Sequence, residues 1–176
     1  MAQTKNLFVL RHAKSSWDNP GLEDHERPLA PRGQRACAVM AEHLRTNAIN
    51  PALVLCSSSR RTRETLEGVA PTGEHLIEPQ LYSASAEEVI DRLRQLPDDL
   101  SSAMIIGHNP TLQQLVLRLT SRDGDGAARS AVERKFPTGA IATLTFECDW
   151  HELGAGRAHL AEFLTPKGLS ATSRAG

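Results

Sequence analysis

Short apolar runs alternate with helical patterns along most of this chain, and that alternation constrains the fold more than any other feature. Three runs are apolar enough for strands buried on both faces, and a weaker run precedes the third; in chain order the four cover residues 5–11, 51–59, 75–82 and 102–109. Between and after them, apolar residues recur at helical spacing over residues 31–47, 60–70, 85–96 and 110–121. This order predicts an α/β fold, a single-domain three-layer sandwich with a mainly parallel central sheet and helices on both faces.

The last third of the chain is less regular. Residues 138–147 and 157–166 read as two late strands that form a hairpin. The glycine-rich segment at 121–130 is expected to be a mobile connection, and whether the whole 121–137 loop shapes the site stays open. The tail from about residue 167 is small and polar, so we expect it to be frayed. We see no linker, and we expect residues 1–176 to form one domain.

Composition excludes several functional classes. The chain has 176 residues, of which 40% are hydrophobic and 23% charged, as expected for one globular domain. A formal net charge of −1 gives no global attraction to nucleic acid or to an anionic membrane. No apolar run approaches the ~20 residues that span a bilayer, and the first residues lack the features of a signal peptide, so we expect a cytoplasmic protein. The cysteines at 37, 56 and 148 predict neither a disulfide framework nor a zinc site.

Charged and polar side chains stand at the ends of the three buried runs. The first run ends in Arg11 and His12, and the third ends just before His108. The second leads into SSSRRTRET, residues 57–65, which places three arginines at the start of a helix. Positive charges there oppose the helix dipole unless an anion is present. Because the carboxyl ends of neighbouring parallel strands meet at one edge of a sheet, we expect a site with two histidines and at least two arginines.

Such a site suits a phosphate group or a similar oxyanion. Guanidinium groups bind phosphate oxygens in a planar geometry, and helix starts add backbone N–H groups. One imidazole can attack phosphorus, and the other can hydrogen-bond an oxygen on which charge develops. Two arginines can supply the stabilisation that magnesium gives elsewhere, so we expect no metal and no cofactor. The chain also lacks a GxxxxGK[ST] loop, which excludes nucleotide hydrolysis of the P-loop kind.

Three segments in the same order resemble the histidine phosphatase superfamily. LFVLRHAK, residues 7–14, resembles its RHG signature, and IIGHNP, residues 105–110, resembles the segment with its second histidine. SSSRRTRET resembles its SPxxRxxxT segment, which places Ser57, Arg61 and Thr65 at the matching positions. The start RHAKSSW and the segment ERPLAPRG at 26–33 look most like SixA-type phosphohistidine phosphatases. The resemblance runs from about residue 7 to about residue 112, and it implies a phosphoglycerate-mutase-like fold.

The resemblance also implies roles for individual residues. His12 would be the nucleophile that becomes phosphorylated, and Arg11 and Arg61 would hold the phosphoryl oxygens. His108 would contact the phosphoryl group and stabilise the transition state. Lys14 would add positive charge at the mouth of the site. The chain departs from the family signature at Ala13, where the third residue is usually glycine.

Many members of this family use an acidic residue to protonate the leaving oxygen, and spacing alone does not identify one here. The candidates are Asp18, Glu23, Asp24, Glu26, Glu87 and Glu88. A phosphohistidine substrate makes this residue less necessary, because its leaving group is an imidazole whose nitrogen takes up a proton readily. Weak general-acid equipment would therefore favour cleavage of a P–N bond over a P–O bond.

Other polar residues in these segments have structural interpretations. Ser57 either bonds within the site or caps the following helix. Asn109 is expected to cap a helix, and Arg27 is expected to hold its loop by pairing with an acid. Trp17 is expected to cover an edge of the sheet, with a position facing the substrate as the alternative.

The sequence thus predicts a metal-independent phosphatase that works through a phosphohistidine enzyme intermediate. Its expected substrate is a phosphohistidine on a phosphotransfer or phosphocarrier protein, because so short a chain leaves little to build a cap over the site. Two alternatives stay open: a small-molecule phosphomonoesterase on the same scaffold, with an acid beside the phosphate, and a non-catalytic phosphate-binding module. The sequence does not identify the partner protein or the oligomeric state.

Overall fold

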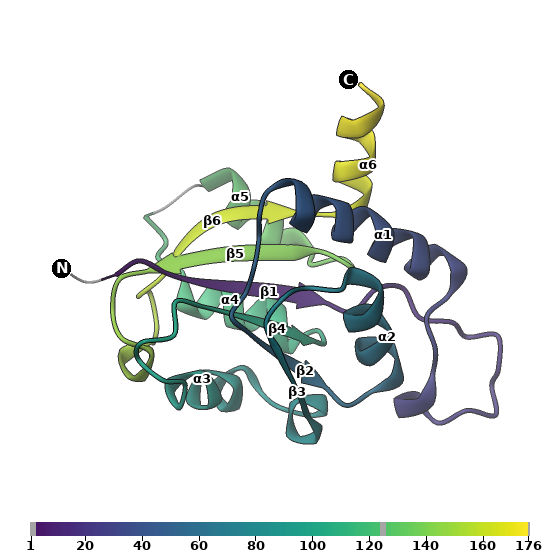
Figure 1. Ribbon diagram of the computed structural model, residues 1–176, viewed down its shortest axis with the longest axis horizontal. Helices are drawn as coiled ribbons and strands as arrows, with labels where there is room; N and C mark the ends of the chain where they lie inside the picture. The colour runs from purple at the N-terminus through teal and green to yellow at the C-terminus, as the bar shows by residue number, and fades with distance from the viewer. Residues whose placement is uncertain (1–2, 124–125, 176) are drawn as a thin grey trace.

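The computed structural model describes residues 3–123 and 126–175 and contains one six-stranded sheet between two layers of helices (Figure 1). The strands are β1 (Lys5–Arg11), β2 (Leu53–Ser57), β3 (Glu74–Glu78), β4 (Ser102–Gly107), β5 (Ile141–Phe146) and β6 (His159–Leu164). They lie in the order β3-β2-β4-β1-β5-β6. The first four in that order are parallel, whereas β5 is antiparallel to both β1 and β6. The mainly parallel sheet and the late hairpin are therefore confirmed.

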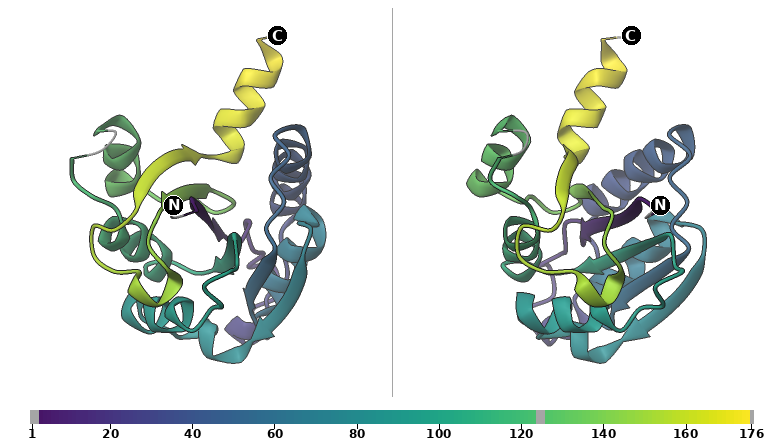
Figure 2. Two further views of the ribbon diagram at one scale, coloured as in Figure 1. Left: turned by 60° about the vertical axis from the view of Figure 1, so that its left-hand side comes forward. Right: turned by 90° about the vertical axis from the view of Figure 1, so that its left-hand side faces the viewer.

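Helices cover both faces of this sheet, as expected. One face carries α1 (Pro31–Thr46) and α2 (Arg60–Val69), and the other carries α3 (Ala86–Arg94), α4 (Thr111–Leu119) and α5 (Gly126–Arg134). Figure 2 shows the two helical layers on either side of the strands. The remaining elements are α6 (Pro166–Arg174) and the short 3-10 helices η1 (Asp24–Glu26), η2 (Pro79–Tyr82) and η3 (Trp150–Glu152).

The core follows from the two-residue period of the strands. In β1, Leu7 and Val9 pack with α3 and α4, while Phe8 and Leu10 pack with α1 and α2. The same alternation holds in β2 and β4, whose residues are all buried. Side chains of a strand point alternately to opposite faces, so a continuous apolar run is what a strand between two helical layers requires.

Residues 126–134 form helix α5, although we expected the 121–137 segment to be a loop. Ala-rich AARSAVER has good helix formers, and Val132 is fully buried against the core. Arg129 fastens the helix by donating hydrogen bonds to the carbonyl oxygens of Thr120 and Leu117. The glycines at the start of this segment led us to predict a loop instead of a helix. Asp125, which we placed in the loop, lies outside the described residues.

The chain ends in helix α6 where we expected a frayed tail. Thr165 caps it, because its side-chain oxygen accepts a hydrogen bond from the backbone N–H of Gly168 at 3.0 Å, and Pro166 occupies the first turn. Leu169 packs against the core on the α1 face. The rest of the helix projects away from the body of the molecule (Figure 1).

The strand registers bring the predicted polar residues to one edge. Arg11 pairs with Gly107 across β1 and β4, and Cys56 pairs with Ile106 across β2 and β4. Residues that directly follow these positions therefore emerge side by side at the carboxyl edge of the sheet. The loop of residues 12–30 extends beyond the same edge (Figure 1).

This loop is fixed against the start of α1. Ser15 and Leu29 form an isolated antiparallel bridge, and the N–H of Ala30 donates to the carbonyl oxygen of Lys14 at 2.8 Å. Gly33 permits the contact, because a Cβ at that position would lie 2.2 Å from the Lys14 oxygen. In the described ranges, no helix is both long and apolar enough to cross a membrane.

Candidate active site

Two histidines and an arginine meet at the carboxyl edge of the sheet. His12 follows β1, His108 follows β4, and their ring centroids are 5.4 Å apart. Arg61 comes from the first turn of α2, and its Nη2 lies 3.5 Å from Nδ1 of His108. The expected convergence of the strand ends is therefore present.

The backbone around His12 is held from three directions. The N–H of His12 donates to the carbonyl oxygen of Gly107 at 3.1 Å. The N–H of Gly139 lies 3.0 Å from the oxygen of His12 and 3.1 Å from that of Arg11. The N–H of Ala13 donates to the hydroxyl of Thr65 at 3.0 Å. These contacts fix the chain direction at the point where the His12 ring leaves β1.

One nitrogen of His12 is occupied and the other is open for chemistry. Nδ1 lies 2.7 Å from the carbonyl oxygen of Ala13. A carbonyl oxygen can only accept a hydrogen bond, so Nδ1 carries the proton and Nε2 keeps its lone pair. Burial lowers the pKa of His12 to about 3, and the charges of Arg61 and Arg11 act in the same direction. At neutral pH, His12 is therefore an uncharged imidazole with a nucleophilic Nε2.

His108 is also neutral and is oriented by Ser57. Nε2 of His108 lies 2.8 Å from the hydroxyl oxygen of Ser57, while Arg61 can only donate toward Nδ1. Burial and then the charge of Arg61 lower the pKa of His108 to about 4. The ring of Tyr82, from η2, contacts His108 edge-on at 5.4 Å between centroids. Ser57 therefore bonds within the site, and Ser59 is the residue that caps α2.

Arg11, at the end of β1, has one buried donor without a partner. Its Nη1 donates to the carbonyl oxygen of Phe136 at 2.9 Å, but its buried Nε has no hydrogen-bond partner. Burial and the charge of Arg61 lower the pKa of Arg11, although a guanidinium stays protonated at neutral pH. A buried donor without a partner is costly, and an oxyanion beside it would satisfy it.

A carboxylate that sequence reasoning left among six candidates holds Arg61. The Arg61 guanidinium donates to the carbonyl oxygen of Asp24 at 2.8 Å and to Oδ2 of Asp24 at 3.0 Å. Tyr82 donates its hydroxyl to the same Oδ2, and Arg27 donates to Oδ1 at 3.0 Å. The hydrogen bond from Tyr82, together with those from Arg61 and Arg27, lowers the pKa of Asp24 to about 2. Asp24 is therefore ionised and unsuited to donate a proton.

Most of the other acidic candidates are engaged away from the rings. Glu88 closes the capping box of α3 with Ser85, and Glu87 pairs with Arg118 at 2.7 Å. Glu26 pairs with His25 at 2.9 Å. Asp18 and Glu23 lie exposed on the loop.

The remaining predicted residues have mixed outcomes. Asn109 accepts a hydrogen bond from the N–H of Gln113 in α4, as expected, and it also donates to the Phe136 oxygen at 3.1 Å. Arg27 pairs with an acid of its loop, as expected. Trp17 does not cover the sheet, because it is 70% exposed.

Lys14 is half-buried beside the site. Its carbonyl oxygen ties the loop to α1, and its amino group forms no ion pair with any residue of the described ranges. The structure thus places Lys14 next to His12 without assigning its charge a partner.

Sequence reasoning missed two groups that shape the site. Tyr82 and the carbonyl oxygen of Phe136 contact the central residues from η2 and from the segment after α5. A backbone carbonyl leaves no trace in sequence, and Tyr82 lay in a segment that reads as a weak strand. In the structure that segment is β3 followed by η2.

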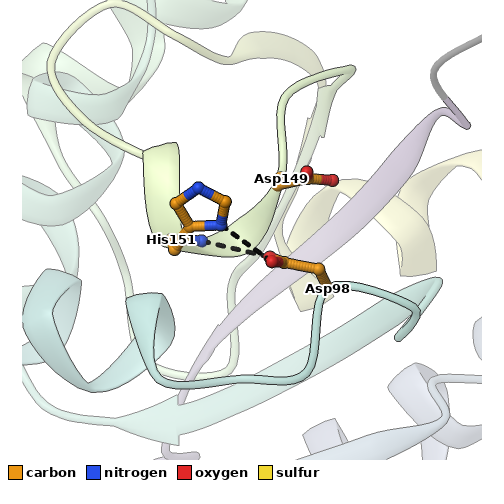
Figure 3. Close-up of side chains that lie close together, drawn as sticks. All are labelled: Asp98, Asp149 and His151. Atoms are coloured by element: carbon orange, nitrogen blue, oxygen red, sulfur yellow. Dashed lines mark hydrogen bonds and ion pairs between the residues drawn. The ribbon is translucent and has the colours of Figure 1, made fainter.

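A second cluster of polar side chains lies at the opposite edge of the sheet. Asp98, Asp149 and His151 bring three potential ligand atoms within 4.8 Å of one another. Figure 3 shows the His151 ring hydrogen-bonded to Asp98 and not to Asp149. Asp98 raises the pKa of His151, and Lys5 pairs with Asp149 at 3.3 Å. Each of the two carboxylates already has a basic partner, His151 for Asp98 and Lys5 for Asp149, and we assign no metal to the cluster.

Comparison with known proteins identifies the family. The model of the histidine phosphatase superfamily (branch 1) matches residues 7–83. The uncharacterized protein Rv1276c of Mycobacterium tuberculosis is 35% identical over 159 residues, which cover 90% of this chain and 100% of that protein. This chain belongs to the histidine phosphatase superfamily.

Solved structures place this histidine phosphatase near the SixA group. A putative phosphohistidine phosphatase SixA from Nakamurella multipartitia is 28% identical, with a TM-score of 0.84 over 94% of this chain and 98% of that one. The protein histidine phosphatase SixA complexed with tungstate is 25% identical, with a TM-score of 0.76 over 93% and 99% of the two chains. The expected phosphoglycerate-mutase-like fold is confirmed by a phosphoglycerate mutase from Plasmodium falciparum, which is 16% identical with a TM-score of 0.61 over 92% and 91%.

Proposed function

We propose that this histidine phosphatase transfers a phosphoryl group to Nε2 of His12 and that its substrate is a phosphohistidine on a protein. The observation that carries the proposal is the state of His12. Its Nδ1 proton is held by the Ala13 carbonyl, its pKa is lowered to about 3, and its Nε2 is free. A neutral, oriented imidazole is the form that can attack phosphorus.

In the first step, Nε2 of His12 would form a bond to phosphorus as the bond from phosphorus to the leaving nitrogen breaks. The phosphorylated ring then carries a positive charge, shared between its two nitrogens. The Ala13 carbonyl, which already accepts the Nδ1 proton, stabilises that charge. The leaving imidazole takes a proton from solvent at its other nitrogen and departs as a neutral ring.

In the second step, water would attack phosphorus on the opposite side from His12. The bond from Nε2 to phosphorus breaks, and its electron pair returns to the ring. The water protons pass to the phosphate and to solvent, so His12 is neutral again. Both steps use the same nitrogen and need no movement of the Nδ1 proton.

The arginines and His108 would stabilise the charge on the transferred group. Arg11 has an unpartnered Nε, and the guanidinium of Arg61 lies beside His108. An incoming phosphate dianion would raise the pKa of His108 and let it share a proton with a phosphoryl oxygen. The protein histidine phosphatase SixA was solved complexed with tungstate, a tetrahedral oxyanion like phosphate, which agrees with a phosphoryl ligand for this chain.

The acidic residues near the site favour cleavage of a P–N bond, because none that the structure describes is placed and protonated to act as a general acid. An alkoxide leaving group needs a proton donor, and the carboxylate beside the rings, Asp24, has a pKa of about 2. Glu87 and Glu88 are committed to Arg118 and to the start of α3. An imidazole leaving group does not depend on such a donor.

A decisive experiment compares two substrates in the presence of EDTA. Wild type should release phosphate from a phosphohistidine peptide at least tenfold faster than from p-nitrophenyl phosphate, and His12→Ala should release none. A phosphoenzyme that is stable in base and labile in acid should form in wild type and not in the variant. Efficient turnover of the ester would favour a phosphomonoesterase, and phosphate binding without a phosphoenzyme would leave a binding module.

A further inference from the structure

We propose that the exposed indole of Trp17, stacked on Arg27, is a docking contact for the phosphorylated protein. This inference rests on the proposed function and adds the surface by which a protein substrate is recognised. The partner it fits carries an apolar or aromatic side chain beside its phosphohistidine.

Trp17 is exposed yet held in place. Its side chain is 70% exposed, whereas Trp150 is fully buried. The guanidinium carbon of Arg27 lies 3.2 Å from the centroid of the Trp17 ring. A ring stacked on one face by a cation has little freedom left to lose when a partner covers its other face.

Arg27 is a rigid support for the ring because it is itself buried and bonded. It donates to the Ser16 carbonyl at 3.1 Å, to the Ser15 hydroxyl at 2.6 Å and to Oδ1 of Asp24 at 3.0 Å. Only 7% of Arg27 is exposed. The exposed position of the indole is therefore set by an ordered part of the loop and not by a flexible one.

The stack is connected to the centre of the site. Asp24 bonds Arg27 through Oδ1 and Arg61 through Oδ2, so one carboxylate separates the support of Trp17 from the guanidinium beside His108. Trp17 also lies on the loop that starts at His12 and extends beyond the carboxyl edge of the sheet (Figure 1). A protein that presents a phosphohistidine to His12 must cover part of this rim, whereas a free amino acid need not.

The charges of the loop indicate which surface a partner protein should present. Asp18 directly follows Trp17, and both Asp18 and Glu23 are exposed. These carboxylates disfavour an acidic surface and favour an apolar spot with basic neighbours. Tryptophan and arginine are also among the residue types enriched at the energetic hot spots of protein interfaces.

The first test separates recognition of the protein from recognition of the phosphoryl group. The substrates are free phosphohistidine and two proteins phosphorylated on histidine, a phosphotransfer domain and a phosphocarrier protein. Trp17→Ala should lower kcat/KM for the better protein substrate by about tenfold or more and leave that for free phosphohistidine within about twofold. Trp17→Phe should keep most of the activity. Ile77→Ala, at the other large exposed hydrophobic residue among those the structure describes, is the matched control and should change neither value.

The second test uses the fluorescence of the two tryptophans. Acrylamide reaches the exposed Trp17 and not the buried Trp150, so the quenchable emission reports on Trp17. In a His12→Ala variant, which prevents turnover, the phosphorylated protein should protect this emission from acrylamide. Free phosphohistidine should give no protection.

Several outcomes would overturn the inference. These are an equal loss on both kinds of substrate, no loss in Trp17→Ala, or a wild type that turns over neither phosphoprotein better than free phosphohistidine. A wild-type dimer that Trp17→Ala converts to a monomer would show that a second copy covers the ring instead. A wild type that hydrolyses the ester but neither kind of phosphohistidine would remove the proposed substrate, and the docking contact with it.

Discussion

Asp24 joins the loop, α2 and η2 through a single carboxylate. It accepts hydrogen bonds from Arg27, Arg61 and Tyr82, and it is the negative group nearest to the two histidines among those described. Its charge therefore both orients Arg61 and competes with any anion that Arg61 binds. These two effects act in opposite directions on phosphate affinity.

We expect Asp24→Asn to bind tungstate or inorganic phosphate more tightly, by roughly threefold to tenfold, because the competing charge is gone. The backbone carbonyl of Asp24 still holds Arg61 in this variant. Titration calorimetry measures the change directly. Glu26→Gln, which removes a charge from the same loop away from Arg61, is the control. Weaker binding in Asp24→Asn would mean that orientation of Arg61 outweighs the charge.

His12 should make stability depend on pH. Its pKa is about 3 in the folded protein and near the ordinary histidine value when unfolded, so the unfolded state binds more protons below about pH 6.5. The free energy of unfolding therefore falls as the pH falls through that window. Asp24 does not contribute between pH 7 and pH 5, because its pKa is lower in both states.

The His12→Asn variant isolates this effect. The loss of unfolding free energy between pH 7 and pH 5 should be smaller by about 2 kcal/mol in the variant than in wild type. Urea denaturation at both pH values gives the comparison. His159→Asn, at an exposed histidine, should behave like wild type. Equal pH dependence in all three proteins would contradict the lowered pKa.

At the scale of elements, the start of α1 positions the loop of residues 12–30. Gly33 lies so close to the loop that a Cβ would stand 2.2 Å from the Lys14 carbonyl oxygen. No flexible side chain can yield at this contact, because the atom it meets belongs to the backbone.

Gly33→Ala should therefore destabilise the protein by about 2 to 4 kcal/mol and lower activity as the loop shifts. Gly126→Ala is the matched control, since a Cβ there meets nothing within 4 Å and alanine favours the helix. Thermal unfolding and phosphate release distinguish the two variants. A stable, fully active Gly33→Ala protein would show that the loop and α1 move apart at little cost.

The elements that carry buried periodic patterns were predictable from sequence. Strands β1, β2 and β4 were found because each lies in a short apolar run, and α3 was found from its capping box. Helices α5 and α6 were missed, since each begins with glycine or proline and buries few side chains. The Thr165-Pro166 pair was a helix-start signal that could have identified α6.

The site shows the same limit. His12, Arg61 and His108 were placed together because parallel strands share an edge. The role of Asp24 was not predictable, because it depends on the path of a loop in which four acids are close in sequence. Partners that arrive as backbone atoms, such as the Phe136 carbonyl, have no sequence signal at all.

For the whole molecule, the net charge is close to zero, but positive side chains gather at one edge of the sheet. The chain carries a formal net charge of −1, yet the carboxyl edge gathers Arg11 and Arg61 beside two neutral histidines. Arg11 and Arg61 can therefore supply the positive charge that a phosphoryl group needs. The opposite edge carries the Asp98, Asp149 and His151 cluster with Lys5.

Phosphatase activity should therefore persist in EDTA and gain nothing from added magnesium, measured as phosphate release from a phosphohistidine peptide. Asp98→Asn removes one member of the distant cluster and should leave the rate within about twofold of wild type. Loss of activity in EDTA that magnesium or zinc restores would contradict a site that relies on arginine.

The backbone around His12 is held by residues far apart in the chain. Thr65, Gly107 and Gly139 all hydrogen-bond to the segment from Arg11 to Ala13. His12 is made early during synthesis, but its setting is complete only when the chain has reached residue 139 and folded. A nascent chain would therefore contain His12 long before the surroundings of that residue exist, and recovery of activity would be among the last events of refolding.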